Sequence, residues 1–225
     1  MDKSLDVEKL NKLIDHVTVG SPTLFIVDET EGEQTFDIFK QSASYVVLDA
    51  DVLNMKKNIQ KQSVSFILEE CRFKLTFAMK YGKILVVRFG NSMTDFKFTF
   101  CDEFCPELTK RHKGLPRQLC SYLPRGFMMN SGQGLRDEAI VRALYRREDL
   151  VEMLLEGDEE NSEDFLSMVP VCHPSFKVVM TTTMPFDKLD DFHFHSKYGL
   201  PAQRSQFDIR RLNLSDEATP LISYP

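Results

Sequence analysis

The chain has 225 residues, of which 42% are hydrophobic and 28% are charged, and its formal net charge is -6. This composition is typical of a soluble globular protein with one sizeable core, and it excludes an intrinsically disordered chain. The acidic balance argues against broad binding to nucleic acid, and no apolar run is long enough for a transmembrane helix. A polar start without a signal segment predicts a cytoplasmic protein whose five cysteines are reduced thiols.

The first 50 residues combine one helical pattern with two short apolar runs. Apolar residues at helical spacing predict a helix over 7–20, and the run over 23–28 predicts a buried strand. An acidic turn over 29–33 begins a short crossover to a second apolar run over 45–51, which also predicts a buried strand.

The next segment predicts a long helical region followed by a third buried strand. Apolar residues recur at three- and four-residue steps over 52–81, and either Ser63 or Ser65 is suited to cap the second half. Gly82 suits the end of the helix, and the strand follows over 83–90. Continuous apolar strands separated by helices are typical of a parallel sheet covered on both faces, so we predict an α/β fold.

The middle of the chain is less regular. Alternating Phe residues predict a half-exposed strand over 94–105, and the Pro- and Gly-rich stretch over 106–134 predicts loops and short helices. The clearest amphipathic helix follows over 135–155. Its basic face is either a solvated surface or a docking site for a protein partner, and it includes Arg142, Arg146 and Arg147.

The last third predicts two further strands. An acidic run over 156–164 predicts a solvated loop. A β-branched apolar run predicts a strand within 176–185, and a shorter one is expected over 207–214. The end of the chain is predicted to be disordered.

The turn after the first strand lacks the features of a phosphate-binding loop. The pattern G-x-x-x-x-G-K-S/T is absent, and Gly32 is the only glycine of the turn. A phosphate needs free backbone N–H groups and positive charge, whereas this turn carries four carboxylates. They are Asp28, Glu29, Glu31 and Glu33.

Two groups of Cys and His residues have side chains that could bind a metal ion. The densest cluster follows no common zinc spacing, so we predict free thiols rather than zinc; it consists of Cys101, Cys105, His112 and Cys120. His193 and His195 are two residues apart, which would place both rings on one face of a strand. We predict that they form a surface pair, with Phe192 and Phe194 facing the core.

Several segments, in this order, resemble the AAA-type motor modules of dynein heavy chains, most closely the fifth module of the ring, which does not hydrolyse ATP. The family's first strand and a degenerate P-loop are similar to SPTLFIVDETEGEQTFDIF (21–39), and its next strand is similar to YVVLDAD (45–51). FAMKYGKILVVRFG (77–90) is similar to the passage leading into the Walker B position. HPSFKVVMTTTMP (173–185) resembles the sensor-1 strand, and FDIRRLNLSDE (207–217) the last core strand.

The resemblance implies a P-loop or AAA-like three-layer domain over 1–217, with its mostly parallel sheet in the core. The core would comprise 10–90 and 170–217, with a long helical insert over 91–169 and a tail over 218–225. The resemblance also implies a cytoskeletal or ciliary setting.

The departures from the family bear on the nucleotide site. No Lys or Thr of the P-loop has a counterpart near Gly32, and the Walker B carboxylate would fall at Arg88. The sensor threonines, Thr181 and Thr182, are retained. If Arg88 lies at the carboxyl end of a central strand beside the turn from Asp28 to Glu33, an internal ion pair would occupy the vacated nucleotide site.

These observations predict a non-catalytic domain that binds no cofactor and serves as a protein-interaction or scaffold module. Two alternatives remain open at this point. One is a module that binds a nucleotide without hydrolysing it, and the other is an enzyme with zinc in the insert over 91–172.

Overall fold

The computed structural model describes residues 7–17, 22–30, 32–100, 173, 175–195, 197–200 and 203–212. Among these residues no helix is long and apolar enough to cross a membrane. The elements are α1 (Val7–Asp15), β1 (Thr23–Asp28), α2 (Gln34–Gln41), β2 (Tyr45–Asp49), α3 (Ala50–Asn58), α4 (Val64–Tyr81), β3 (Ile84–Arg88), β4 (Lys177–Thr182), α9 (Leu189–His193) and β5 (Phe207–Leu212). Two 3-10 turns cover Phe186–Lys188 and Arg204–Gln206.

The five strands form one parallel sheet in the order β2-β3-β4-β1-β5. This confirms the predicted α/β fold. Every residue of β1 is buried, as expected for an interior strand without a polar face. In β2 only Leu48 is fully buried, although the sequence predicted a buried strand there, because β2 lies at the edge of the sheet.

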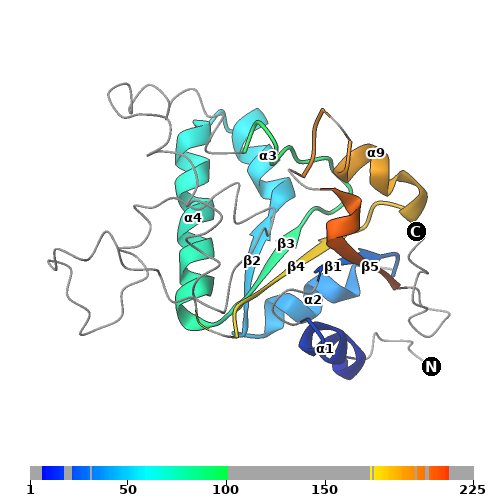
Figure 1. The fold of residues 1–225 in the computed structure, drawn as a ribbon. Coiled ribbons are helices and arrows are strands. Elements are labelled where there is room, and N and C mark those ends of the chain that lie inside the picture. Colours follow the sequence, from blue (N-terminus) through cyan, green and yellow to red (C-terminus); the bar gives the residue numbers. More distant parts are fainter. Residues whose placement is uncertain are drawn as a thin grey trace, which may run out of the picture.

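Helices cover both faces of the sheet, so the described residues form three layers (Figure 1). On one face, α1 and α2 contribute Ile14 and Phe39 to a core with Leu24 and Ile26 of β1. On the other face, α3, α4 and α9 contribute Leu53, Leu75 and Leu189 to the larger core. Parallel strands with crossovers on both faces bring all their carboxyl ends to one edge.

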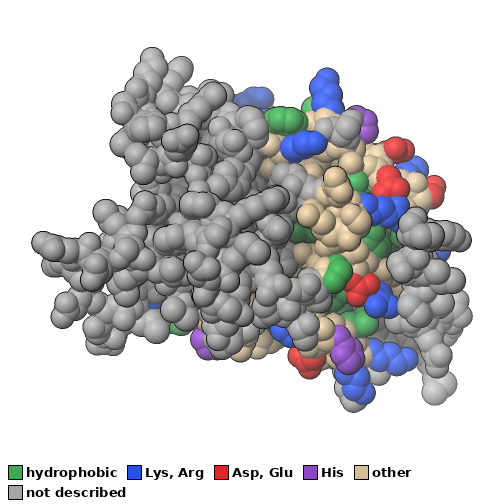
Figure 2. All heavy atoms as spheres, in the orientation of Figure 1, with side chains coloured by type: hydrophobic (Ala, Val, Ile, Leu, Met, Phe, Trp, Pro, Cys, Tyr) green, Lys and Arg blue, Asp and Glu red, His purple; other side chains and the backbone are tan. Residues whose placement is uncertain are grey.

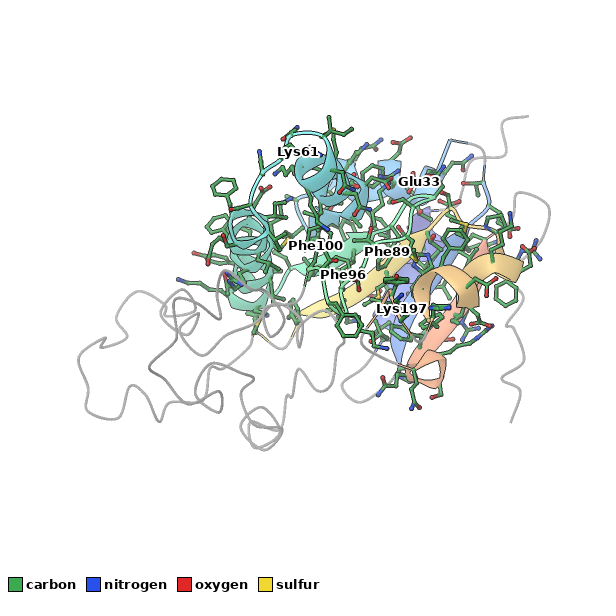
Figure 3. The ribbon with its side chains drawn as sticks, turned by 90° about the horizontal axis from the view of Figure 1, so that it is seen from above. Glu33, Lys61, Phe89, Phe96, Phe100 and Lys197 are labelled. Atoms are coloured by element: carbon green, nitrogen blue, oxygen red, sulfur yellow. The ribbon has the colours of Figure 1, made fainter. Side chains whose placement is uncertain are left out.

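The predicted helical region over 52–81 is two helices joined by a short connection. Lys61 has a left-handed backbone with φ of 56° and lies in this connection (Figure 3). The Ser63 hydroxyl then accepts a hydrogen bond of 3.3 Å from the backbone N–H of Phe66, which confirms Ser63 as the cap of α4. Gly82 ends α4 with φ of 62°, as predicted.

The strand predicted over 94–105 is wrong for its described part, residues 94–100, which form turns. The Asp95 carboxylate accepts hydrogen bonds from the backbone N–H groups of the residues two, three and four positions later. A side chain that takes these donors competes with strand pairing. Phe96 and Phe100 instead pack beside Phe89 in the core, with successive ring centroids 5.9 and 6.0 Å apart (Figure 3).

Several predicted elements lie outside the described residues: the helix over 135–155, the acidic loop over 156–164 and the tail over 218–225. The division of the chain into core and insert therefore stays a prediction. On the side seen in Figure 2, acidic and basic side chains mix over the region of α9 and β5. The coloured surface on that side carries no broad area of a single charge.

Candidate functional site at the carboxyl edge of the sheet

The carboxyl ends of neighbouring strands align polar side chains on one face of the sheet. Asp49 at the end of β2 pairs in register with Arg88 of β3, and Arg88 pairs with Thr181 of β4. Asp28 ends β1, the next strand along. The connections after β1 and β4 leave on opposite faces, through α2 and α9. In open α/β sheets such a switch point is where ligands bind, which makes this edge the candidate site.

Asp28 organises the turn between β1 and α2. Its side chain is buried, and its carboxylate accepts hydrogen bonds from the backbone N–H groups of Thr30 at 2.9 Å and Thr35 at 3.0 Å. The hydroxyl groups of the same two threonines also donate to it. The Asp28 carboxylate therefore accepts hydrogen bonds from one backbone N–H of the turn and one at the start of α2, which are donors that a phosphate would otherwise use.

Gly32 and Glu33 both have left-handed backbones, with φ of 77° and 56°. This conformation is uncommon for a residue with a side chain and costs on the order of 1 kcal/mol. Glu33 is the N-cap of α2, and its carboxylate accepts hydrogen bonds of 2.7 Å from both Nε and Nη2 of Arg88. The strained turn thus aims Glu33 at Arg88 in the bidentate geometry that guanidinium and carboxylate prefer.

Arg88 joins three carboxylates, and we call Arg88, Glu33, Asp49 and Asp51 the ion cluster. Its Nη1 donates to both oxygens of Asp49 at 3.0 Å and to Oδ2 of Asp51 at 3.1 Å. Burial alone would lower the pKa of Arg88. The hydrogen bond and charge of Glu33, with the charges of Asp49 and Asp51, outweigh burial and raise that pKa. Arg88 is therefore a fixed cation.

Neighbouring residues hold the ion cluster in place. The guanidinium carbon of Arg88 lies 4.4 Å from the centre of the Phe36 ring on α2. Asp49 also caps α3, because its Oδ1 accepts a 3.1 Å hydrogen bond from the backbone N–H of Asp51. Gly90 has φ of 58°, and a Cβ there would lie 2.1 Å from the Asp51 carboxylate. The close approach therefore requires glycine.

The two sensor-like threonines lie in different environments on the two faces of β4. Thr181 is buried beside Arg88, and its hydroxyl has no hydrogen-bond partner among the described residues. The Thr182 hydroxyl donates to the carbonyl of Gly90 at 2.9 Å and accepts from the backbone N–H of Met184 at 3.1 Å. It also lies 3.0 Å from Nε2 of His193. Thr182 thus links the end of β4 to α9.

His193 overturns the predicted surface pair. It lies in α9 rather than in a strand, is fully buried, and packs its ring 4.6 Å from that of Phe89. Because the only proton of the Thr182 hydroxyl is given to Gly90, Nε2 of His193 must donate to it, and Nδ1 then carries no proton. Burial lowers the pKa of His193 to about 4, so the ring is neutral at pH 7. His195, by contrast, is exposed as predicted.

Other predicted site residues lie outside the described residues. They are the soft-ligand cluster Cys101, Cys105, His112 and Cys120, and the basic residues Arg142, Arg146 and Arg147. The part of the chain that the structure describes contains no group of three or more His, Cys, Asp or Glu side chains suited to a metal ion.

The ion cluster joins parts of the fold and disfavours an anionic ligand. One cation faces three carboxylates, so the cluster has a net charge of -2. The oxygens of Glu33 and Asp49 bind Arg88, and Asp51 binds Arg88 through one oxygen and Ser92 through the other. The carboxylates thus have protein partners, and their excess charge repels an anion such as a phosphate. The cluster ties the turn after β1, the start of α3 and the end of β3 to one another.

The contact between Arg88 and the acidic turn is suggested by the sequence, whereas the other partners of Arg88 and the burial of His193 are not. The hypothesis from the sequence, that an internal ion pair forms if Arg88 lies beside the acidic turn, meets its condition, because Arg88 lies there and pairs with Glu33. It missed Asp49 and Asp51 as partners, although both follow an apolar run, and the ends of parallel strands meet at one edge. His193 gave no comparable signal, because a single histidine between two phenylalanines fits a surface or a core equally well.

Comparison of the chain with known protein families, with curated protein sequences and with solved structures finds no match in any of the three.

Proposed function

We propose that this chain is a non-catalytic, dynein-related AAA-like domain that acts as a protein-interaction or scaffold module. The observation that carries the proposal is the ion cluster around Arg88, which lies at the switch point where an open α/β sheet would bind its ligand. A related ATPase needs a carboxylate at the position of Arg88 to hold Mg²⁺, and a guanidinium repels that ion.

The turn after β1 supports the same proposal. A nucleotide phosphate is bound by free backbone N–H groups and a lysine, whereas the N–H of Thr30 in this turn and that of Thr35 at the start of α2 donate to Asp28. Glu33, which follows Gly32 where the P-loop lysine would stand, is committed to Arg88. To bind a triphosphate the chain would have to break the Glu33–Arg88 pair and then leave several carboxylates beside the anion.

The strand order supports the AAA-like part of the proposal. Because β4 lies between β1 and β3, the acidic turn, Arg88 and the threonine pair meet at one edge. The resemblance needs this arrangement, since it assigns these three segments to the P-loop, Walker B and sensor-1 positions. The cytoskeletal or ciliary setting rests on the resemblance alone and belongs to the proposal.

Titration calorimetry of the full chain with ATP and with ADP, each with Mg²⁺, tests the non-catalytic part. We expect no heat of binding at millimolar nucleotide and no release of phosphate. The variant in which Arg88 and Glu33 are both alanine removes the bidentate pair, and we expect it to bind no nucleotide either, because no lysine replaces the lost contact.

The other outcomes separate the alternatives. Micromolar binding with phosphate release would refute the proposal and make the chain an ATPase. Micromolar binding without release would support the nucleotide-binding alternative. Stoichiometric zinc in the purified chain, measured by elemental analysis, would instead favour the zinc enzyme and implicate Cys101, Cys105, His112 and Cys120.

A further inference from the structure

Four aromatic side chains form an exposed row along α4, and we call Phe66, Phe73, Phe77 and Tyr81 the aromatic stripe. Their residues are 62%, 64%, 39% and 50% exposed, in that order. Spacings of seven and four residues place them on one side of the helix. The rings of Phe73 and Phe77 lie 6.4 Å apart, and those of Phe77 and Tyr81 lie 4.8 Å apart.

The aromatic stripe faces away from the domain core. The opposite side of α4 is fully buried against the sheet through Ile67, Cys71, Leu75 and Ala78. The exposed rings are therefore not required to hold α4 on the sheet. A large aromatic side chain offers 150–250 Å² of surface, so the exposed parts of the four sum to roughly 400 Å². The largest apolar patch of a typical monomer covers about 300–600 Å² and is often functional, which makes the stripe a candidate interface.

The charged residues along the exposed side of α4 change sign along the helix. Glu69 and Glu70 lie between Phe66 and Phe73, and keep 55% and 35% of their side chains exposed while they bind Arg72 and Lys56. Lys74 and Lys80 lie in the second half of the helix and are partly exposed, and Lys74 also donates to the backbone carbonyl of Val47 at 3.1 Å. The stripe therefore has an acidic half and a basic half.

This polarity fits a second copy of the same helix in the antiparallel direction. A two-fold axis near Phe73 sets Phe66 of one copy opposite Tyr81 of the other. Glu70 then lies opposite Phe77, within one helical turn of Lys74 and Lys80 of the second copy. Opposite charges meet on both sides of the axis, and only the two Lys74 side chains approach each other near it, whereas a parallel pair would bring like charges together along the whole stripe. Such a self-complementary patch is what a two-fold dimer requires.

We propose that the aromatic stripe is the interface of an antiparallel homodimer. The proposal rests on α4 alone and holds whether or not the domain binds a nucleotide, because the ion cluster belongs to the other face of the sheet. The rings of two copies supply roughly 800 Å², which is below the range of about 1,200–2,000 Å² for a stable interface, so the dimer is weak and dissociates in the micromolar range.

Sedimentation velocity of the full chain from roughly 1 to 100 µM, under reducing conditions, tests the dimer. We expect a concentration-dependent shift toward twice the chain mass of 26.0 kDa. Phe73→Asp should raise the dissociation constant about a hundredfold or more, because it removes the central ring of the stripe and buries a charged group in its place. Tyr198→Asp is the matched control, since Tyr198 is 38% exposed and lies outside α4.

A charge exchange tests the antiparallel direction. Glu70→Lys and Lys80→Glu should each weaken the dimer about tenfold, because each places like charges at both ends of the interface. The double variant restores opposite charges between the copies, and its dissociation constant should return close to that of the unmodified chain.

Three results would overturn the proposal. A chain that stays monomeric at the highest concentration has another occupant on the stripe or none. A loss of thermal stability in Phe73→Asp that exceeds both the loss in Tyr198→Asp and the helix-propensity cost of Asp within α4 would then identify a segment of the same chain as the occupant. A dimer that Phe73→Asp does not weaken, or that the charge exchange does not restore, forms through a different surface or in a different direction.

Discussion

Replacing Arg88 by Met tests whether the ion cluster stabilises the fold at the carboxyl edge of the sheet. Methionine keeps the apolar contact with the ring of Phe36 but removes the cation. Three carboxylates then remain together without it, on side chains that are 14%, 19% and 34% exposed. Removing one partner of a buried ion pair typically costs 3–5 kcal/mol, and the partial exposure of Asp51 favours the lower value.

We therefore expect Arg88→Met to lower the free energy of unfolding by about 3 kcal/mol, which is roughly 6–12 °C in melting temperature for a domain of this size. Urea denaturation at pH 7, followed by circular dichroism, measures the change. High salt should recover part of the loss, because it screens the repulsion among the three carboxylates. Arg88→Lys should lose about half as much, since it keeps the charge without the bidentate fork.

Arg211→Met is the matched control for this prediction. Nε of Arg211 donates to Glu29 at 2.7 Å, but the Arg211 side chain is 44% exposed. An exposed ion pair contributes under about 1 kcal/mol. The reasoning would be refuted if Arg88→Met and Arg211→Met destabilised the chain equally, because the ion cluster would then contribute no more than a surface pair.

Two further predictions concern the buried groups at the end of β4. The pKa of His193 is about 4 in the fold and about 6.5 in the unfolded chain, so the unfolded chain binds more protons between these values. Stability should fall by about 2 kcal/mol from pH 7 to pH 5 because of this group, and His193→Gln should lack that component. Thr182→Val should cost about 2–3 kcal/mol, because it leaves three hydrogen-bonding groups without their partner, whereas Thr181→Val should be neutral or stabilising.

Each of these two predictions has a clear contrary result. An unchanged pH dependence in His193→Gln, measured by urea denaturation at several pH values, would mean that another group controls acid stability; His195→Gln is its exposed control. Equal losses in the two threonine variants would mean that the Thr182 hydroxyl does not link β4 to α9.

Local patterns were sufficient for most of the fold within the described residues. Apolar runs identified four of the five strands, because a strand buried on both faces needs an unbroken apolar sequence, whereas the edge strand β5 was expected from a short segment of mixed polarity. They did not separate the edge strand β2 from the interior ones, since neighbours in the sheet are set by the crossovers. The turns at 94–100 were missed because the side chain of Asp95 took the backbone donors that alternation alone assigned to a strand.

For the candidate site too, some features follow from the sequence and others depend on the tertiary structure. The acidic turn, Arg88 and the absence of a P-loop pattern are properties of the sequence, and they led to the hypothesis of an ion pair at this edge, conditional on where Arg88 lies. The number of partners was decided by the tertiary structure, because register brings Asp49 beside Arg88 and the capping of α3 brings Asp51 there. His193 is neutral for the same reason: burial between aromatic rings lowers its pKa, and burial depends on which segments the fold brings together.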